Sequence, residues 1–285
     1  MNVRGAGLRK LAYAGARYGP RFWVKYSPTL FGVAFACALP GERAKIRASL
    51  RRLLGTRGAV RENLDVVRTF VAYAHCLAES LAAERPEALS ATPVVSGSEH
   101  LRAVLAAGKG AIVVTAHCGS WDAAARFLAR DHAADVLVVM AREADRGAGG
   151  LQDVIRERSG VRVAHVGGHP LDALKALAHL RRGGFVAVQL DRIAGLETTL
   201  AVPLSGAPFR VPAGPFRLAA LTGAPIVPVF TRRLGFFRHE IEIAPPIWVS
   251  GSGAEAEIEA AAHAAARSME RFLTDNPTQW FHFSH

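Results

Sequence analysis

Short apolar runs alternate with longer amphipathic stretches through the chain after residue 93. The runs are rich in Val and Ile, and turns containing Gly or Pro separate them from the amphipathic stretches. The pattern predicts strands near 94–96, 111–115, 136–140, 161–166, 185–190, 199–203, 226–230 and 239–243, and helices near 99–108, 120–131, 148–159, 170–182, 213–222 and 254–274. This alternation is typical of α/β domains, so we predict a mostly parallel central sheet with helices on both faces.

Residues before Thr92-Pro93 follow a different pattern, in which apolar positions recur at spacings of three and four. Residues 43–54 and 62–84 show this helical spacing most clearly. We therefore predict two units. Residues 1–92 form a basic, partly amphipathic helical segment that packs on the body, and residues 93–285 form the α/β domain.

The positive charge is concentrated near the amino terminus. The whole chain has a net charge of +11, and residues 1–61 contain thirteen Lys and Arg residues against a single acid, Glu42. Aromatic and aliphatic residues lie between these cations, as in helices that bind an anionic membrane surface. A basic helical hairpin that only packs on the body is the alternative. Nucleic acid is not an expected partner, because no recognition motif accompanies the charge.

Composition narrows the class of protein further. Half of the 285 residues are hydrophobic, which favours a sizeable folded core. The three cysteines are far apart in the sequence, a pattern typical of a reduced, intracellular compartment. No uninterrupted apolar run approaches the ~20 residues that a membrane-spanning helix needs. We expect a protein that associates with a membrane at its surface.

The strand expected at 111–115 is followed at once by His117 and, five residues later, by Asp122. Sites in α/β sheets gather where strands end and helices begin. An imidazole is a natural general base near neutral pH, and a carboxylate that binds its second nitrogen fixes the tautomer. Between them, Gly119 allows close approach to the backbone, and Ser120 is expected to cap the helix and leave open amides for an anion. The alternative is a structural histidine followed by an ordinary first-turn acid.

Five blocks of the chain resemble one known family, the lysophospholipid and lipid A acyltransferases, whose signature is HxxxxD or HxxxxE. The resemblance runs in the family's order through about residues 40–283, and its blocks are His117–Asp122, Val188–Arg192, Val202–Pro215, Ala219–Phe230 and Asn276–Phe283. It implies transfer of a fatty acyl group from acyl-CoA or acyl carrier protein to a hydroxyl of a membrane lipid or glycolipid. His117 would be the general base, and no metal or other cofactor is implied.

The resemblance also assigns further residues. A second acid, Asp191, becomes a candidate to orient the histidine beside Asp122, and the sequence does not choose between the two. Arg192 and Arg210 are candidates for binding phosphate, together with the amides near Gly214 at an expected helix start. Trp121 is expected to line the acyl channel or to be a core aromatic. Cys118 is a weak candidate nucleophile, because adjacent residues at a strand end usually point to opposite sides.

Two departures from the family's lipid A members affect the expected acceptor. Those members usually carry HxxxxE after a membrane-spanning segment, whereas this chain has Asp122 and a broken apolar stretch, Pro28–Leu39. We therefore expect a peripheral enzyme at the cytoplasmic face of the bacterial inner membrane, acting on a glycolipid such as a phosphoinositol mannoside, or on a lysophospholipid. Two alternatives remain open: N-acylation of an amine, and a catalytically idle lipid-binding protein with the same fold.

Overall fold

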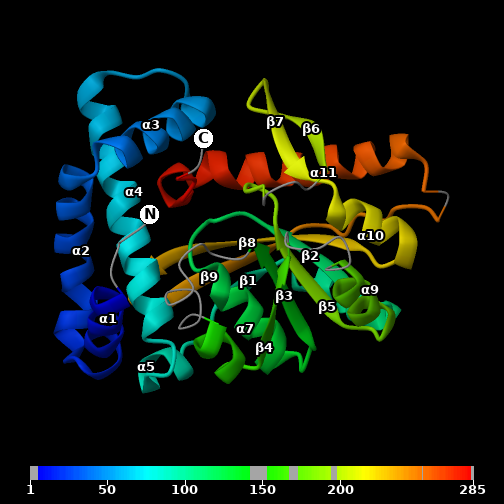
Figure 1. The fold of residues 1–285 in the computed structure, drawn as a ribbon, viewed down its shortest axis with the longest axis horizontal. Coiled ribbons are helices and arrows are strands. Elements are labelled where there is room, and N and C mark those ends of the chain that lie inside the picture. The colour runs from blue at the N-terminus through cyan, green and yellow to red at the C-terminus, as the bar shows by residue number, and fades with distance from the viewer. Residues whose placement is uncertain (1–5, 142–152, 167–172, 194–197, 252, 284–285) are drawn as a thin grey trace.

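A seven-stranded sheet forms the centre of the protein, as the computed structural model shows for residues 6–141, 153–166, 173–193, 198–251 and 253–283. Its strand order is β1-β9-β8-β2-β5-β3-β4, and all neighbours are parallel except β8 and β9 (Figure 1). The strands are β1 Val94–Ser96, β2 Ala111–Thr115, β3 Val136–Ala141, β4 Val161–Val166, β5 Phe185–Gln189, β8 Ile226–Gly235 and β9 Arg238–Ile243. The predicted mixed α/β fold with a mostly parallel sheet is confirmed.

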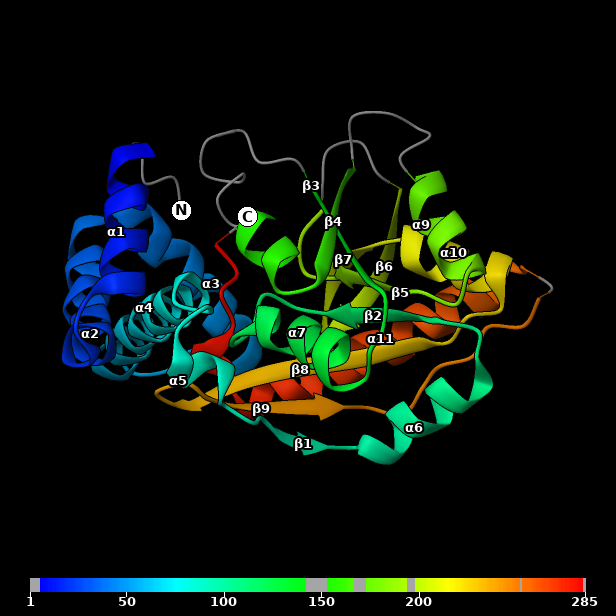
Figure 2. The same cartoon turned by 90° about the horizontal axis from the view of Figure 1, so that it is seen from below.

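Helices cover both faces of this sheet (Figure 2). One face packs against α9, α10 and α11, and the other against α6 and α7. Their bounds are α6 Ser98–Ala107, α7 Trp121–Asp131, α9 Ala173–Arg181, α10 Gly214–Thr222 and α11 Glu255–Asp275, followed by the short 3₁₀ helix η2 Pro277–Gln279. Residues 153–158 are also helical. The first residues of the helices predicted at 148–159 and 170–182 lie outside the described part.

A two-stranded hairpin was only half predicted. Its strands are β6 Thr199–Leu204 and β7 Ala207–Pro212, joined at Ser205-Gly206, where both residues have positive φ angles of 51° and 73°. That geometry suits the tight turns that match the twist of a hairpin. The second strand was missed because it contains Pro208 and Pro212, and proline removes a ladder donor. A two-stranded sheet has only edge strands, so it tolerates both.

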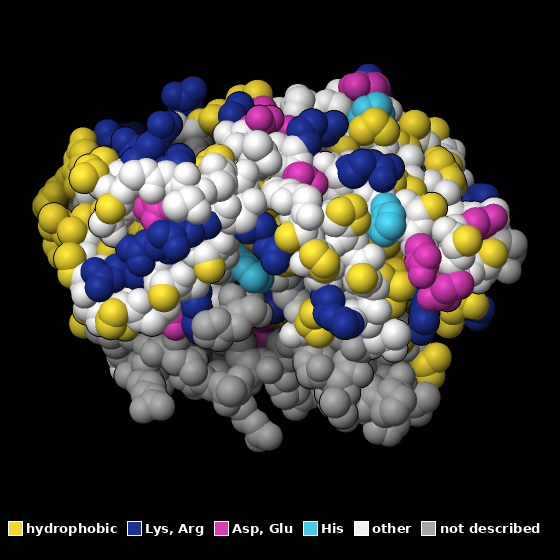
Figure 3. Space-filling view, turned by 90° about the horizontal axis from the view of Figure 1, so that it is seen from above, with side chains coloured by type: hydrophobic (Ala, Val, Ile, Leu, Met, Phe, Trp, Pro, Cys, Tyr) yellow, Lys and Arg dark blue, Asp and Glu magenta, His cyan; other side chains and the backbone are white. Residues whose placement is uncertain are grey.

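Five helices precede the sheet and form a layer at one end of the molecule. They are α1 Ala6–Tyr18, α2 Arg21–Ala38, α3 Pro40–Leu54, α4 Ala59–Leu81 and α5 Pro86–Leu89. Helices α2 and α4 cross closely at Gly32, where an added Cβ would lie 2.6 Å from the Cα of Val71. Apolar side chains gather over α2 at the left of the molecule, beside a band of Lys and Arg (Figure 3).

No single helix in the described ranges combines the length and apolar character needed to cross a bilayer. Helices α2 and α3, which meet at 99°, would pass that test only as a bent pair.

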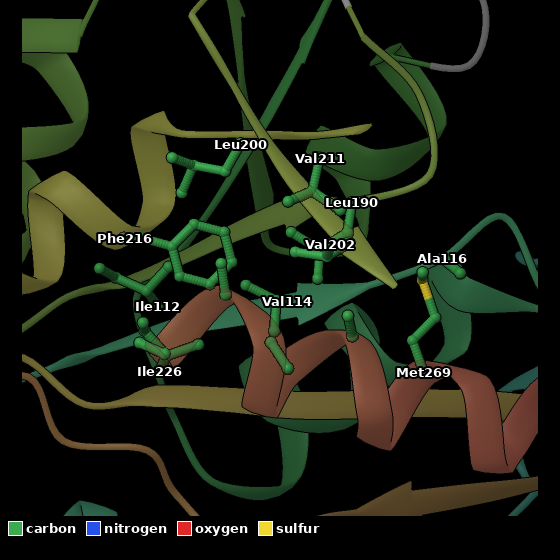
Figure 4. Close-up of a cluster of buried hydrophobic side chains, with 14 of the residues drawn as sticks. Ile112, Val114, Ala116, Leu190, Leu200, Val202, Val211, Phe216, Ile226 and Met269 are labelled. Atoms are coloured by element: carbon green, nitrogen blue, oxygen red, sulfur yellow. The ribbon is translucent and has the colours of Figure 1, made fainter. Parts of the chain in front are cut away.

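The main hydrophobic core lies between the sheet, α11 and the β6–β7 hairpin. Alternation along β2 directs Ile112 and Val114 into this core, while Val113 faces the second core under α7. Phe216 of α10 and Met269 of α11 fill the space between the layers, and both are fully buried (Figure 4). The carboxyl end of β2 is therefore packed on both faces of the sheet, and the loop that starts at Ala116 begins from a rigid position.

Candidate active site

The carboxyl ends of two neighbouring strands bring His117 and Asp191 together. Thr115 at the end of β2 pairs in register with Gln189 at the end of β5. His117 and Asp191 each follow two residues later, so their side chains meet at the same edge of the sheet. The Nδ1 atom of His117 lies 2.8 Å from Oδ1 of Asp191. The carboxylate that contacts the motif histidine is thus Asp191 and not Asp122.

Asp191 is enclosed by hydrogen-bond donors. Besides His117 Nδ1, it accepts the backbone N–H of His117 at 3.1 and 3.0 Å and the indole N–H of Trp280 at 2.9 Å. Burial opposes its ionisation, but the electrostatic interaction with the His117 ring and the hydrogen bonds from His117 and Trp280 hold the pKa of Asp191 well below its ordinary value. The carboxylate therefore stays ionised and favours the tautomer in which Nδ1 carries the proton. Nε2 is then the nitrogen that can accept one.

The carboxyl-terminal segment lies along the motif like an additional strand. Phe281 donates its N–H to the carbonyl of His117 at 2.7 Å, and Gly119 donates to the carbonyl of Gln279 at 3.1 Å. The side chain of Gln279 in turn bonds both the N–H and the carbonyl of Arg233 on β8. This segment thereby ties the His117 loop to the sheet and delivers Trp280 to Asp191.

Asp122 occupies a separate, buried ion-pair site in the first turn of α7. Its Oδ1 accepts from Arg156 Nε at 2.9 Å, and its Oδ2 accepts from the hydroxyl of Ser80 on α4 at 2.8 Å. Burial would raise the pKa of Asp122, but the charges of Arg156 and Arg126 hold it below its ordinary value. The arrangement fixes α7 to α4 and to the helix at 153–158, which makes Asp122 a support of the motif.

Substituting Asp122 with Asn is expected to lower the free energy of unfolding by about 2 kcal/mol, because a charged hydrogen bond to the buried guanidinium of Arg156 is lost. Urea unfolding at pH 7 measures this change. The exposed Asp131→Asn at the end of the same helix is the matched control. An unfolding midpoint equal to that of wild type would contradict the structural role of Asp122.

Two expectations about the motif loop need correction. Gly119 has a φ of +51°, and a Cβ there would lie 2.2 Å from the carbonyl oxygen of Thr231, so the close neighbour of its backbone is β8. Its amide is already bonded to Gln279, and the amide of Cys118 is bonded to Ala116. Ser120 holds the N-cap position of α7 but makes no capping hydrogen bond with its side chain. The amides of Cys118 and Gly119 are therefore occupied, which leaves Ser120 and the first turn of α7 as the nearest candidates to bind an anion.

The predicted phosphate-binding residues lie in different places. Arg192 directly follows Asp191 and is exposed. Arg210 bonds Thr199 at 2.9 Å on the exposed face of the hairpin, opposite the face on which Phe209 packs toward Trp280. Gly214 begins α10. Within the described residues, no hydrogen bond or ion pair links Arg210 or Gly214 to the His117–Asp191 pair.

An apolar cavity lies between α7 and the sheet, next to the motif. Trp121 forms part of its wall, and the guanidinium of Arg156 lies 4.6 Å from the centre of the indole ring. The other lining residues are Val113, Thr115, Ala124, Ala125, Leu128, Val138, Val139, Ala187, Val188, Gln189 and Val229. The cavity is small, with a volume of about 20 Å³ and an almost wholly apolar lining, and Thr115 and Trp121 place it beside the motif.

Cys118 faces away from this cavity and has no exposed surface. Burial raises the pKa of its thiol to about 12. A thiol that stays protonated and inaccessible is a poor nucleophile. In the described part of the chain, no three or more His, Cys, Asp or Glu side chains are grouped so as to hold a metal ion.

Three residues that bind Asp122 or Asp191 could not be identified from the sequence. Arg156 and Ser80 lie within helical patterns, and nothing local connects them with Asp122, which is 34 and 42 residues away. Trp280 lies in the last block that resembles the family, so the resemblance was a signal that this segment matters. It gave no indication that the indole binds Asp191.

Comparison with known proteins identifies the family. Residues 12–285 match the family described as bacterial lipid A biosynthesis acyltransferase. The chain is also 31% identical over 135 residues to proteins named phosphatidylinositol mannoside acyltransferase from two strains of Mycobacterium tuberculosis, H37Rv and CDC 1551. That similarity covers 47% of this chain and 42% of each relative, less than half of either. The family match, in contrast, spans nearly the whole chain, and the protein therefore belongs to the bacterial lipid A biosynthesis acyltransferase family.

Proposed function

We propose that the protein transfers a fatty acyl group from the thioester of acyl-CoA or acyl carrier protein to a hydroxyl of a membrane glycolipid or lysophospholipid. The observation that carries the proposal is the His117–Asp191 pair at the carboxyl edge of the sheet. Family membership supports acyl transfer to a lipid acceptor. The name of the mycobacterial relatives suggests a phosphoinositol mannoside as one acceptor to test.

The chemistry follows from the geometry of the pair. Nε2 of His117 takes the proton of the acceptor hydroxyl, and the oxygen attacks the thioester carbonyl. Asp191 stabilises the imidazolium that forms. Negative charge on the carbonyl oxygen would be favoured near the open amides at the start of α7. As the intermediate collapses, the C–S bond breaks and the imidazolium returns its proton to the leaving thiolate. The acyl chain would enter at the apolar cavity beside Trp121, which has a volume of about 20 Å³ and must widen to hold it.

The proposal is tested by thiol release from palmitoyl-CoA, and from palmitoyl carrier protein, with and without a crude bacterial lipid extract. Lipid-dependent release with a newly acylated lipid in the mass spectrum is expected. Mild alkaline hydrolysis then distinguishes the two possible products. An ester is cleaved, whereas an amide survives and would mean that the acceptor is an amine. Release without lipid would mean hydrolysis, and no release from either donor would mean an idle lipid-binding fold.

Acyl-chain preference should depend on Ala125, which is buried on α7 and lines the cavity. Ala125→Leu adds three carbon atoms there and is expected to raise the ratio of kcat/KM for lauroyl-CoA over palmitoyl-CoA about 15-fold, since excluding roughly two methylenes of the longer chain at about 0.8 kcal/mol each costs about 1.6 kcal/mol. Ala129→Leu, on the same helix but outside the cavity lining, is the control. An unchanged ratio in folded Ala125→Leu would place the acyl chain elsewhere.

Membrane binding is proposed for the exposed apolar side chains of α1 and α2. Tyr18, Phe22, Tyr26 and Leu30 are each more than 60% exposed, and the region around them is basic. The double variant Phe22→Ser/Leu30→Ser is expected to weaken binding to anionic vesicles about 30-fold, the equivalent of about 2 kcal/mol of lost apolar burial. Vesicle sedimentation measures it.

The control for this experiment is Leu174→Ser/Leu221→Ser, which removes two exposed leucines from α9 and α10. It should leave vesicle binding unchanged. Binding of the wild type should also fall as salt rises, because the attraction between basic residues and anionic lipid is screened. Equal binding to neutral and anionic vesicles at every salt concentration would contradict the proposal that the protein prefers an anionic membrane surface.

A further inference from the structure

A second histidine, His282, lies beside the catalytic pair and has no part in the proposed proton transfer. Its ring stacks on the indole of Trp280, with the ring centres 4.9 Å apart and the planes inclined by 18°. The N–H of that indole donates to Oδ2 of Asp191 at 2.9 Å. His282 therefore contacts the Trp280 indole, which in turn binds the Asp191 carboxylate that also contacts His117.

Partners from three parts of the chain fix the His282 ring. The hydroxyl of Ser49 on α3 lies 3.2 Å from Nδ1 of His282 and also bonds the His282 carbonyl at 3.3 Å. The ring hydrogen-bonds to the backbone of Asp191. The ring centre of Phe209, on the β6–β7 hairpin, lies 6.0 Å from that of His282, and the guanidinium of Arg52 lies 5.6 Å from the centre of the Phe209 ring. A ring bound on so many sides is held in one orientation.

The charged groups that face His282 make its neutral form the favoured one. Burial, together with the charges of His117 and Arg192, lowers the pKa of His282, while Asp191 acts in the opposite direction. From α3, Ser49 presents its hydroxyl to the ring, and the cation Arg52 contacts Phe209, the aromatic neighbour of His282. A proton on His282 would place a second positive charge beside Asp191 and compete with His117 for it.

We propose that His282 is a positioning residue: stacked on Trp280 and anchored by Ser49, it keeps the indole N–H on Oδ2 of Asp191 and so leaves Oδ1 for His117. This inference rests on the proposed function. Without the stack, the indole is free to tilt, Asp191 loses one of its donors, and the imidazole of His117 loses its fixed orientation. The residue acts on the rate of acyl transfer and not on the binding of the acyl donor.

Two variants test the inference in the full-length protein. His282→Phe retains an aromatic ring on the indole but removes both ring hydrogen bonds, and Ser49→Ala removes only the anchor on α3. We expect kcat to fall about 10-fold in His282→Phe and about 3-fold in Ser49→Ala, with KM for palmitoyl-CoA changed less than 2-fold in both. The acid limb of the pH profile of kcat/KM should be less steep in His282→Phe, because one inactivating proton is lost.

A spectroscopic readout separates positioning from a loss of stability. In protein labelled with ¹⁵N-histidine, the Nδ1–H proton of His117 that bonds to Asp191 should be downfield in the wild type and should shift or broaden in both variants. An unshifted resonance together with unchanged kcat would overturn the inference, as would a variant that only melts at a lower temperature. His117→Ala is measured in parallel. If His117→Ala keeps full activity, the proposed function fails. If His117→Ala is inactive while His282→Phe has the kcat of the wild type, only the present inference fails.

Discussion

His117→Ala is expected to lower kcat for acyl transfer by about 1,000-fold, which is within the range that general-base catalysis contributes. The variant removes Nε2, the atom proposed to take the proton of the acceptor. It leaves the backbone bonds of residue 117 to Asp191 and Phe281 in place. The fold should therefore survive, and circular dichroism and vesicle binding should match those of the wild type. Thiol release from palmitoyl-CoA in the presence of acceptor lipid measures the loss.

The neighbouring residue provides the matched control for that experiment. Cys118→Ala removes a thiol that is fully buried and whose pKa is raised to about 12. The activity of this variant should remain within about 3-fold of wild type, since the small space left by the missing sulfur atom affects stability more than chemistry. If Cys118→Ala were inactive and His117→Ala retained a tenth or more of the wild-type rate, the thiol and not the imidazole would be the reacting group.

Asp191→Asn is expected to reduce kcat about 100-fold or more without a comparable change in the KM for palmitoyl-CoA. The amide cannot stabilise the imidazolium, and its NH₂ group must face at least one of the three donors that now converge on the carboxylate. An unmatched buried donor also costs about 1–3 kcal/mol of stability. Urea unfolding should therefore show a lower midpoint at pH 7, and Asp131→Asn should show neither effect.

The pH dependence of stability gives Asp191 a second signature. Because its pKa in the folded protein lies below the value of about 4 typical of an unfolded chain, it stabilises the fold above that value. The stabilisation is lost as pH falls from about 4 toward the folded pKa. The wild type should thus lose more stability than Asp191→Asn between pH 5 and 3. Parallel losses in the two proteins would contradict an ionised Asp191.

Most of the fold could be predicted because its signals are local. Apolar runs such as residues 111–115 and 226–230 have the composition of buried strands, and all eight predicted strands are present. The second strand of the β6–β7 hairpin was missed because its prolines argue against a strand in isolation. Its pairing with β6 is what stabilises it, and pairing is not visible in a short window of sequence.

The site was predictable only in part, and for a similar reason. His117 could be identified because it follows a core strand and belongs to a motif. The choice between Asp122 and Asp191 required the strand order, since only the pairing of β2 with β5 places residues 117 and 191 side by side. Arg156, Ser80 and Trp280 come from elements whose positions depend on how helices and the carboxyl-terminal segment pack. That packing leaves no pattern in the residues themselves.

The strand-like attachment of residues 277–283 to the motif loop has a consequence for biosynthesis. During translation the chain emerges from the ribosome with the His117 loop about 160 residues ahead of this attachment. The sheet can form first, but the loop lacks its hydrogen-bond partners and Asp191 lacks its indole until Trp280 has been made. Incomplete chains released before that point would have the apolar cavity but no ordered His117–Asp191 pair. The nascent protein would thus lack an assembled site until synthesis has passed these residues.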